Sequence, residues 1–185
     1  MRAVTDAMAA GAAFSEEHSA AVQALFDDMA PGWHSHDQPE RLVALEDVLQ
    51  RIELPPGRLI ELGAGTGIGT RVIARHRRPD AAIDLSAGML AEAPAGLAPW
   101  VRADASRLPF ADDTADVLVL LNMLLFPTEV DRVLAPAGSL VWVNTVGEAT
   151  PIHLPAETVV AALPGEWTAD ASRAGNGTWC VARRV

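Results

Sequence analysis

The sequence predicts a single-domain α/β protein with a doubly wound, mostly parallel sheet that ends in an antiparallel hairpin. Three observations predict this fold class. The chain has 185 residues, of which 50% are hydrophobic, and this fits one domain with a sizeable core. Short apolar runs alternate with helix-like segments over residues 58–144, as in parallel sheets with crossover helices. Near the C-terminus, two strand-like runs flank a short turn that contains glycine, which is typical of a hairpin.

Two helices are predicted before the alternating region. Apolar residues recur at helical spacing over 15–30, where Ser15 is the expected N-cap. A second helix is predicted over 38–52, because Asp37 and Glu40 have the spacing of a capping box. These segments are too short for a core of their own, so we expect them to pack over the sheet.

The alternating region and the tail together predict seven strands. The expected strands are 58–62, 81–85, 100–103, 116–121, 139–144, 166–173 and 177–184. The expected helices between them are 67–76, 86–93, 128–134 and 156–163. The fourth strand is apolar after its first residue, as a strand buried on both faces should be. We expect one domain over 1–185, made of an N-terminal helical cap (1–56) and a core (57–185).

Composition excludes several classes of protein. A single cysteine, Cys180, cannot form an intramolecular disulfide, and no apolar run has the length of a bilayer span. The Ala-rich N-terminus lacks the apolar core of a signal peptide. These features favour a cytoplasmic location.

The charge balance bears on partners. The formal net charge is −10, and every basic residue is an arginine. Proteins that bind nucleic acids or anionic membranes need basic surface, so both partners are disfavoured and a small-molecule substrate is favoured. The oligomeric state is open.

The strongest motif is a glycine-rich segment at the end of the first expected strand. It reads Glu61-Leu62-Gly63-Ala64-Gly65-Thr66-Gly67. Glycines at a strand end allow a sharp turn and let a ligand approach the main chain closely. The helix that follows directs its free N–H groups to the same place. By itself this segment is also compatible with a tight turn that binds nothing.

Acidic residues end the next two expected strands. Asp84 follows Gly63 by 21 positions, which is the spacing at which an acidic side chain reaches ribose hydroxyls. Asp104 ends the third strand. The carboxyl ends of parallel strands line the crevice where open α/β sheets bind ligands. Together with the glycine segment, these residues indicate a nucleoside site.

The dinucleotide fingerprint GxGxxG is not met, because the sixth position is Ile68 when counted from Gly63 and Thr70 when counted from Gly65. Glu61 would also bring a negative charge close to a pyrophosphate. A ligand with a cationic amine tolerates this carboxylate better, and S-adenosylmethionine has such an amine together with a ribose and an adenine.

Several segments together resemble the class I S-adenosylmethionine-dependent methyltransferases, and the type 11 subgroup in particular. The matching segments are ELGAGTG at 61–67, DLSAGML at 84–90, DASRLPF at 104–110 and RVLAPAG at 132–138. They occur in order and at the family's spacing. The resemblance implies a Rossmann-like seven-stranded sheet with strand order 3-2-1-4-5-7-6, and S-adenosylmethionine as the cofactor, with S-adenosylhomocysteine as the product.

The resemblance also implies roles for individual residues. The loop of Gly63, Ala64, Gly65, Thr66 and Gly67 would contact the methionine part, and Glu61 would serve its amine. Asp84 would accept the ribose hydroxyls. Leu85 and Met89 would pack on the adenine, although ordinary core packing explains both equally well. The remaining expected contacts are Asp104 and Ala105 at the adenine amine, and Leu121 and Asn122 beside the sulfonium.

Methyl transfer depends mainly on bringing the acceptor and the methyl group together in a dry pocket, and a general base helps when the acceptor must lose a proton. The candidate bases are His34 and His36, in a loop where relatives place a cap over the cofactor. Trp33 is a candidate aromatic wall over the sulfonium. No third ligand accompanies the two histidines at a telling spacing, so no metal site is expected.

The leading hypothesis is methyl transfer from S-adenosylmethionine to an O or N atom of a small molecule. The alternative is a protein that binds S-adenosylmethionine or S-adenosylhomocysteine without turnover, because many relatives have a His pair where this chain has Leu125-Phe126, and little chain is left for a lid. A nicotinamide-dinucleotide protein is a third hypothesis that rests only on fold analogy.

Overall fold

The computed structural model describes residues 1–185 and confirms the predicted fold class and strand order. Seven strands form one sheet in the order β3-β2-β1-β4-β5-β7-β6. All pairs from β3 to β5 are parallel, whereas β7 is antiparallel to both β5 and β6. The strands are β1 Leu59–Leu62, β2 Ala81–Asp84, β3 Trp100–Arg102, β4 Ala115–Leu121, β5 Leu134–Asn144, β6 Trp167–Ala174 and β7 Gly177–Arg184.

Seven α-helices and three short 3-10 helices surround this sheet. The α-helices are α1 Arg2–Ala9, α2 Glu16–Met29, α3 Val43–Arg51, α4 Ile68–His76, α5 Ala87–Ala91, α6 Pro127–Val133 and α7 Ala156–Ala162. The 3-10 helices are η1 Ala30–His36, η2 Pro39–Arg41 and η3 Gly147–Ala149. None of the helices has both the length and the apolar character that a bilayer crossing requires.

The sheet is covered on both faces, and each face has its own apolar cluster. On one face, Leu45 of α3 and Ile73 of α4 pack against Val119 and Val143 in the centre of the sheet. On the other face, α1, α6 and α7 cover a larger cluster that includes Trp142. Burial on both faces explains why β4 is almost continuously apolar.

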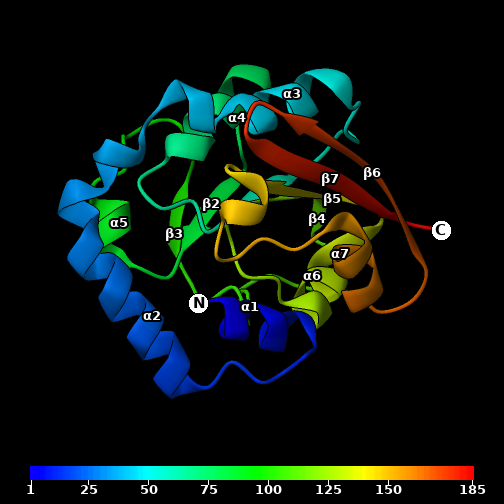
Figure 1. Ribbon diagram of the computed structural model, residues 1–185, viewed down its shortest axis with the longest axis horizontal. Helices are drawn as coiled ribbons and strands as arrows, with labels where there is room; N and C mark the ends of the chain where they lie inside the picture. The colour runs from blue at the N-terminus through cyan, green and yellow to red at the C-terminus, as the bar shows by residue number, and fades with distance from the viewer.

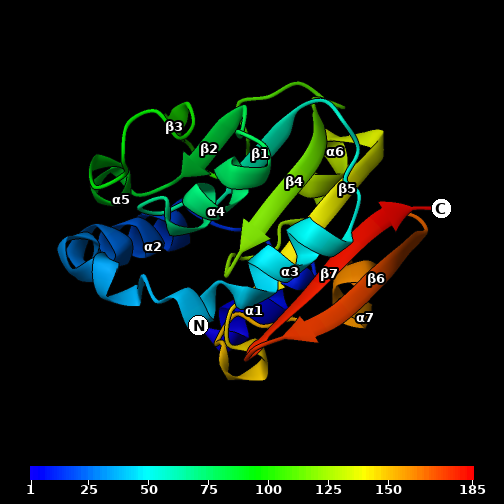
Figure 2. The same cartoon turned by 90° about the horizontal axis from the view of Figure 1, so that it is seen from above.

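The first two helices lie at the carboxyl edge of the parallel strands, where the site residues were expected. Figure 2 shows α1 and α2 along the edge toward which the β4 arrow points. Helix α2 packs on α5, and α1 packs near α7 (Figure 1). Helix α2 therefore covers the strand ends, whereas α3 and α1 also pack against opposite faces of the sheet.

The predicted capping box at residues 37–40 is wrong. Residues 39–41 form η2, and α3 begins only at Val43, with no side chain capping its N-terminus. The Asp37 carboxylate instead accepts a hydrogen bond from the Arg71 guanidinium at 2.6 Å. An ion pair across two segments has replaced the local cap.

Helix α1 was not predicted, although Val4, Ala7 and Met8 do lie at helical spacing. Tertiary contacts hold it in place. The Arg2 guanidinium donates hydrogen bonds to the backbone carbonyls of His153 and Thr150, and Thr5 is fully buried. The His153 and Thr150 carbonyls lie about 150 positions from Arg2 in the chain, so the sequence around Arg2 does not indicate these hydrogen bonds.

If the N-terminal segment and the sheet form one cooperative unit, Leu45→Ala should destabilise the whole protein. Leu45 is fully buried between α3 and the sheet. Removing such a side chain costs about 2–5 kcal/mol. We expect one urea transition at a lower midpoint by circular dichroism. Leu25→Ala is the matched control, because Leu25 is 46% exposed. Two separate transitions would contradict the single-domain prediction.

Candidate functional site

The glycine loop between β1 and α4 has a conformation that depends on glycine. Gly63, Gly65 and Gly67 have φ values of 71°, 55° and 84°, in the left-handed region. A Cβ added at Gly63 would lie 2.5 Å from the Met123 Sδ, and one at Gly67 would lie 2.8 Å from the Trp100 ring. Both backbone strain and lack of space therefore exclude larger residues at these two positions.

Asp84, the last residue of β2, is bound to this loop. Its Oδ2 accepts a hydrogen bond from the Gly65 N–H at 2.7 Å, and its Oδ1 accepts one from the Ser86 N–H at 2.8 Å. Burial raises the pKa of Asp84, against the opposing effect of these backbone donors. A carboxylate has about four acceptor positions and the Gly65 and Ser86 N–H groups do not fill them, so the residue keeps acceptor capacity that suits a ribose hydroxyl.

Asp104, two residues beyond β3, is also held by two donors. Its Oδ1 accepts from the Ser106 N–H at 2.8 Å, and its Oδ2 accepts from the Ser19 hydroxyl of α2 at 2.7 Å. Burial works against the charge of Asp104, but the hydrogen bonds from Ser106 and Ser19 outweigh it and lower the pKa of the carboxyl. Asp104 is therefore a fixed anion whose free lone pairs suit an amine donor.

Glu61 is buried beneath the glycine loop. Its Oε2 accepts a hydrogen bond from the Thr70 hydroxyl at 2.5 Å, and its Oε1 is 2.7 Å from the place where a Cβ on Gly69 would lie. Burial raises the pKa of Glu61 to about 8, and the hydrogen bond from Thr70 offsets only part of that effect. Glu61 therefore bears a proton near neutral pH until a cation comes close to it.

Trp33 lies over the glycine loop. Its Nε1 is 3.9 Å from the place where a Cβ on Gly65 would lie. The ring meets Phe26 edge-on, with centroids 5.7 Å apart, and stacks on His36 at 4.5 Å. His36 Nδ1 lies 3.2 Å from the Trp33 carbonyl, whereas His34 is exposed. An aromatic cluster of η1 and α2 therefore adjoins the loop.

The other expected contact residues fall into two groups. Buried Ala64, Thr66, Met89 and Ala105 and half-buried Leu85 lie in or beside the loops after β1, β2 and β3, as predicted from their positions. The Met89 Sδ is 4.0 Å from the Cβ position on Gly65. The two residues at the end of β4 contact the start of α4 and the end of β5.

Leu121 and Asn122 contact other parts of the protein. A Leu121 methyl carbon is 2.8 Å from the Cβ position on Gly69, so this side chain packs under α4. Asn122 has a φ of 49° and exchanges two hydrogen bonds of 2.9 Å with Thr145, which fixes the end of β4 to the end of β5. Met123, which the sequence analysis did not select, is the side chain that covers Gly63.

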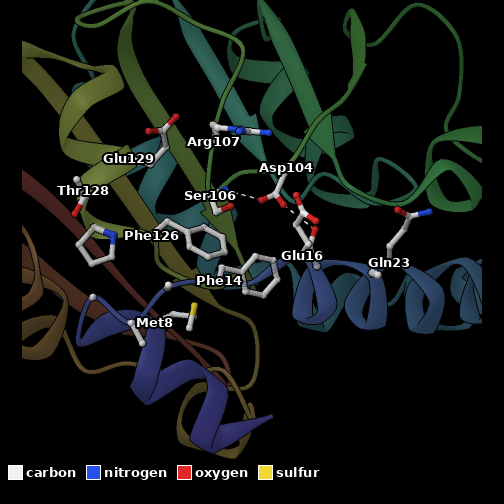
Figure 3. Close-up of a pocket in the computed structure, with 16 residues that line it drawn as sticks. Met8, Phe14, Glu16, Gln23, Asp104, Ser106, Arg107, Phe126, Thr128 and Glu129 are labelled. Carbon is white, nitrogen blue, oxygen red and sulfur yellow. Dashed lines mark hydrogen bonds between the residues drawn. The ribbon is translucent and has the colours of Figure 1, made fainter.

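A cavity of about 620 Å³ adjoins Asp104. It lies between the α1–α2 connection, the loop after β3 and the start of α6 (Figure 3). Phe14 and Phe126 meet inside it with ring centroids 5.2 Å apart, and Glu16 lies beside Asp104 in the same view. The glycine loop and Asp84 are not among its lining residues. This cavity therefore lies next to the expected adenine end of the site.

Sequence reasoning missed the residues of α2 that face the strand ends. Ser19, Gln23 and Asp27 are spaced four residues apart and lie on one helix face. Ser19 binds Asp104, and Asp27 binds Ser86 at 2.5 Å. This polar stripe is the one sequence feature that could have indicated these contacts, but it has the same pattern as an ordinary solvent-exposed helix face. No group of three or more His, Cys, Asp or Glu side chains is placed to hold a metal ion.

Comparison with known proteins finds sequence relatives among the methyltransferases. A type 11 methyltransferase family model, described as a methyltransferase domain, matches residues 60–142. A malonyl-acyl-carrier-protein O-methyltransferase from Halorhodospira halophila is 35% identical over 139 residues, which cover 65% of this chain and 46% of that protein. A demethylmenaquinone methyltransferase from Corynebacterium urealyticum is 36% identical over 99 residues, 49% of this chain and 43% of that protein.

Solved structures share the fold. A methyltransferase from Thermotoga maritima, described as a possible histamine N-methyltransferase, superposes with a TM-score of 0.69 at 15% identity, covering 88% of this chain and 99% of that one. The chain spans less than half the length of the two curated relatives above.

The strand order is the one expected from the resemblance to class I S-adenosylmethionine-dependent methyltransferases, and the glycine loop and Asp84 lie where that resemblance puts the cofactor. Residues 60–142, less than half of the chain, match the type 11 methyltransferase domain family. S-adenosylmethionine is the cofactor of this family. The residues of this chain fit it, because three left-handed glycines leave the main chain open and Asp84 and Asp104 keep free acceptor sites.

The pKa of Glu61 gives a prediction for stability. Burial raises this pKa from 4.5 to about 8, so the folded protein keeps a proton that the unfolded chain loses between these values. Stability should therefore fall as pH rises from about 4.5 to about 8. In Glu61→Gln this contribution is absent, so the variant should gain stability relative to the wild type across that window in urea titrations. Glu92→Gln, at an exposed position, should follow the wild type. Parallel curves for Glu61→Gln and wild type would contradict the assignment.

Proposed function

We propose that this chain binds S-adenosylmethionine at the carboxyl edge of its sheet and methylates an O or N atom of a small-molecule acceptor. The observation that carries the proposal is the hydrogen bond of 2.7 Å between the Gly65 N–H and Asp84. It joins the glycine loop to an acidic strand end that retains free acceptor positions. That pairing suits a nucleoside with an attached amino acid.

The residues around this hydrogen bond have complementary tasks. Asp84 accepts the ribose hydroxyls, and Asp104 accepts the adenine amine beside the Ala105 backbone. Met89 and Leu85 cover the adenine, and the glycine loop contacts the amino-acid part. The positive charge of the amine would lower the raised pKa of Glu61, so that Glu61 loses its proton to solvent and becomes the counter-charge of the amine. Trp33 shields the reacting centre from water.

S-adenosylmethionine supplies a methyl group that its sulfonium already activates. The protein therefore has to orient the acceptor and exclude water, and most of the rate comes from this positioning. An alcohol acceptor must also lose a proton, and His36 and His34 are the candidate bases. His36 is the better placed of the two, because its ring stacks on Trp33 over the glycine loop.

The cavity beside Asp104 supports a small acceptor. Its volume of about 620 Å³ suits a metabolite rather than a folded protein or a nucleic acid. Phe14, Phe126 and Met8 give it an apolar part, while Glu16 and Arg107 give it charged groups of opposite sign. One curated relative is an O-methyltransferase, and another is a demethylmenaquinone methyltransferase.

The alternative function is binding of S-adenosylmethionine or S-adenosylhomocysteine without turnover. It is favoured by the exposure of His34 and by the hydrogen bonds of the Asn122 amide with Thr145, since an exposed base and an amide that is already paired are less available to an acceptor. A methyl-transfer screen measures S-adenosylhomocysteine formed in the presence of alcohols, phenols, amines and carboxylates. Turnover of any acceptor supports the enzyme. Tight cofactor binding without turnover across the screen supports the alternative.

Asp84→Ala should weaken cofactor binding at least about tenfold, because the ribose loses a charged hydrogen-bond acceptor. Calorimetric titration with S-adenosylhomocysteine measures this change. Asp6→Ala is the matched control, since Asp6 is exposed on α1. An affinity equal to that of the wild type would eliminate Asp84 as the ribose acceptor.

Trp33→Leu tests the aromatic wall. A ring face attracts the cationic sulfonium but has no such attraction for the neutral thioether of the product. The variant should therefore lose affinity for S-adenosylmethionine about threefold or more beyond its loss for S-adenosylhomocysteine. The product serves as the internal control in calorimetry. Equal losses for the two ligands would show that Trp33 acts through packing alone.

A further inference from the structure

We propose that α2 is a fixed wall of the cofactor site and that Asp27 is its positioning residue, which acts on the loop after β2 through Ser86 and Gly88. The inference rests on the proposed function. It assigns a role in cofactor binding to a residue that lies outside every motif of the family resemblance and that does not itself contact the glycine loop.

Asp27 caps α5 from another helix. Its Oδ1 accepts hydrogen bonds from the Ser86 hydroxyl at 2.5 Å and from the Gly88 N–H at 2.9 Å. Its Oδ2 accepts one from the Gln23 side chain at 3.2 Å. The hydrogen bond from Ser86, followed by those from Gly88 and Gln23, lowers the pKa of Asp27, so the carboxylate is charged at neutral pH. A charged group at this helix start is also favoured by the helix dipole.

Ser86 transmits this contact to the ribose acceptor. Its N–H donates to Asp84 Oδ1 at 2.8 Å, while its hydroxyl oxygen accepts from the Met89 N–H at 3.0 Å. One serine therefore joins Asp27 to both Asp84 and Met89, the residues expected at the ribose and the adenine. When the Ser86 hydroxyl loses its acceptor, the position of this whole loop is less well defined.

The same helix reaches the next acidic strand end. Ser19, eight residues before Asp27 and on the same face of α2, donates to Asp104 at 2.7 Å. Helix α2 thus contacts Asp104 directly through Ser19. It contacts Asp84 indirectly, because Asp27 binds Ser86 and Ser86 binds Asp84. The helix sets the spacing between these two carboxylates and covers the crevice from one side, and Figure 1 shows α2 extending alongside α5.

Gly88 provides independent support. It lies inside α5, where alanine forms a better helix than glycine and where its φ does not require glycine. A Cβ at Gly88 would lie 3.1 Å from the Asp27 Cα and 3.2 Å from the Asp27 carbonyl oxygen. Backbone atoms cannot rotate away as a side chain does. Glycine at this position is therefore explained by the close approach of α2 to α5.

The test is calorimetric titration of the full chain with S-adenosylhomocysteine. Asp27→Ala should raise the Kd about tenfold, because the cap and the tether to Ser86 are both lost. Asp27→Asn should weaken binding less than Asp27→Ala, since the amide oxygen still accepts a hydrogen bond. Gly88→Ala should also raise the Kd, although alanine favours helix α5 itself. Asp28→Ala is the matched control, because Asp28 is exposed and has no side-chain hydrogen bond in the structure.

Hydrogen exchange gives a second readout. In Asp27→Ala the amides of residues 84–91 should exchange faster, while those of the central strands keep the wild-type rate. The proposal is overturned if the wild type binds but both Asp27→Ala and Gly88→Ala have a Kd within about twofold of the wild type, or if Asp27→Asn fails as completely as Asp27→Ala. A wild type that does not bind S-adenosylhomocysteine overturns the proposed function itself, and this inference with it.

Discussion

The hydrogen bond between the Gly65 N–H and the Asp84 carboxylate is the contact on which the site depends. It closes the glycine loop against the end of β2, next to the strand that the loop has just left. The loop can reach Asp84 only because Gly63, Gly65 and Gly67 adopt left-handed conformations. The parallel pairing of β1 and β2 brings both strand ends to one edge, so sheet topology and ligand chemistry coincide there.

Two buried carboxyl groups at this edge pose an electrostatic problem. Burial raises the pKa of both Glu61 and Asp84, and their mutual repulsion adds to the rise for Glu61. The backbone donors stabilise Asp84 as an anion, whereas Glu61 has only the Thr70 hydroxyl. The two carboxyl groups therefore differ in the ligand group that they suit. Asp84 suits neutral hydroxyl donors, and Glu61 suits a cation that arrives with the ligand.

The N-terminal segment has two different structural tasks. Helix α3 buries Leu45 and Val48 on a face of the sheet, as an amphipathic helix does. Helix α2 has no buried residue, and its contacts with the sheet edge are polar. Hydrogen bonds therefore give this helix its defined position, with little hydrophobic stabilisation.

The sequence by itself determined the fold class, the strand order by resemblance, and most element positions, because the apolar periods and the glycine and proline breaks are local signals. It also selected Gly63, Asp84 and Asp104, which the structure places at one edge. Only the tertiary structure decided where α1 lies and what Asp37 binds. The same is true of Ser19 and Asp27 at the site. Their partners are distant in the chain, and a hydrogen bond between distant segments leaves no periodicity in either one.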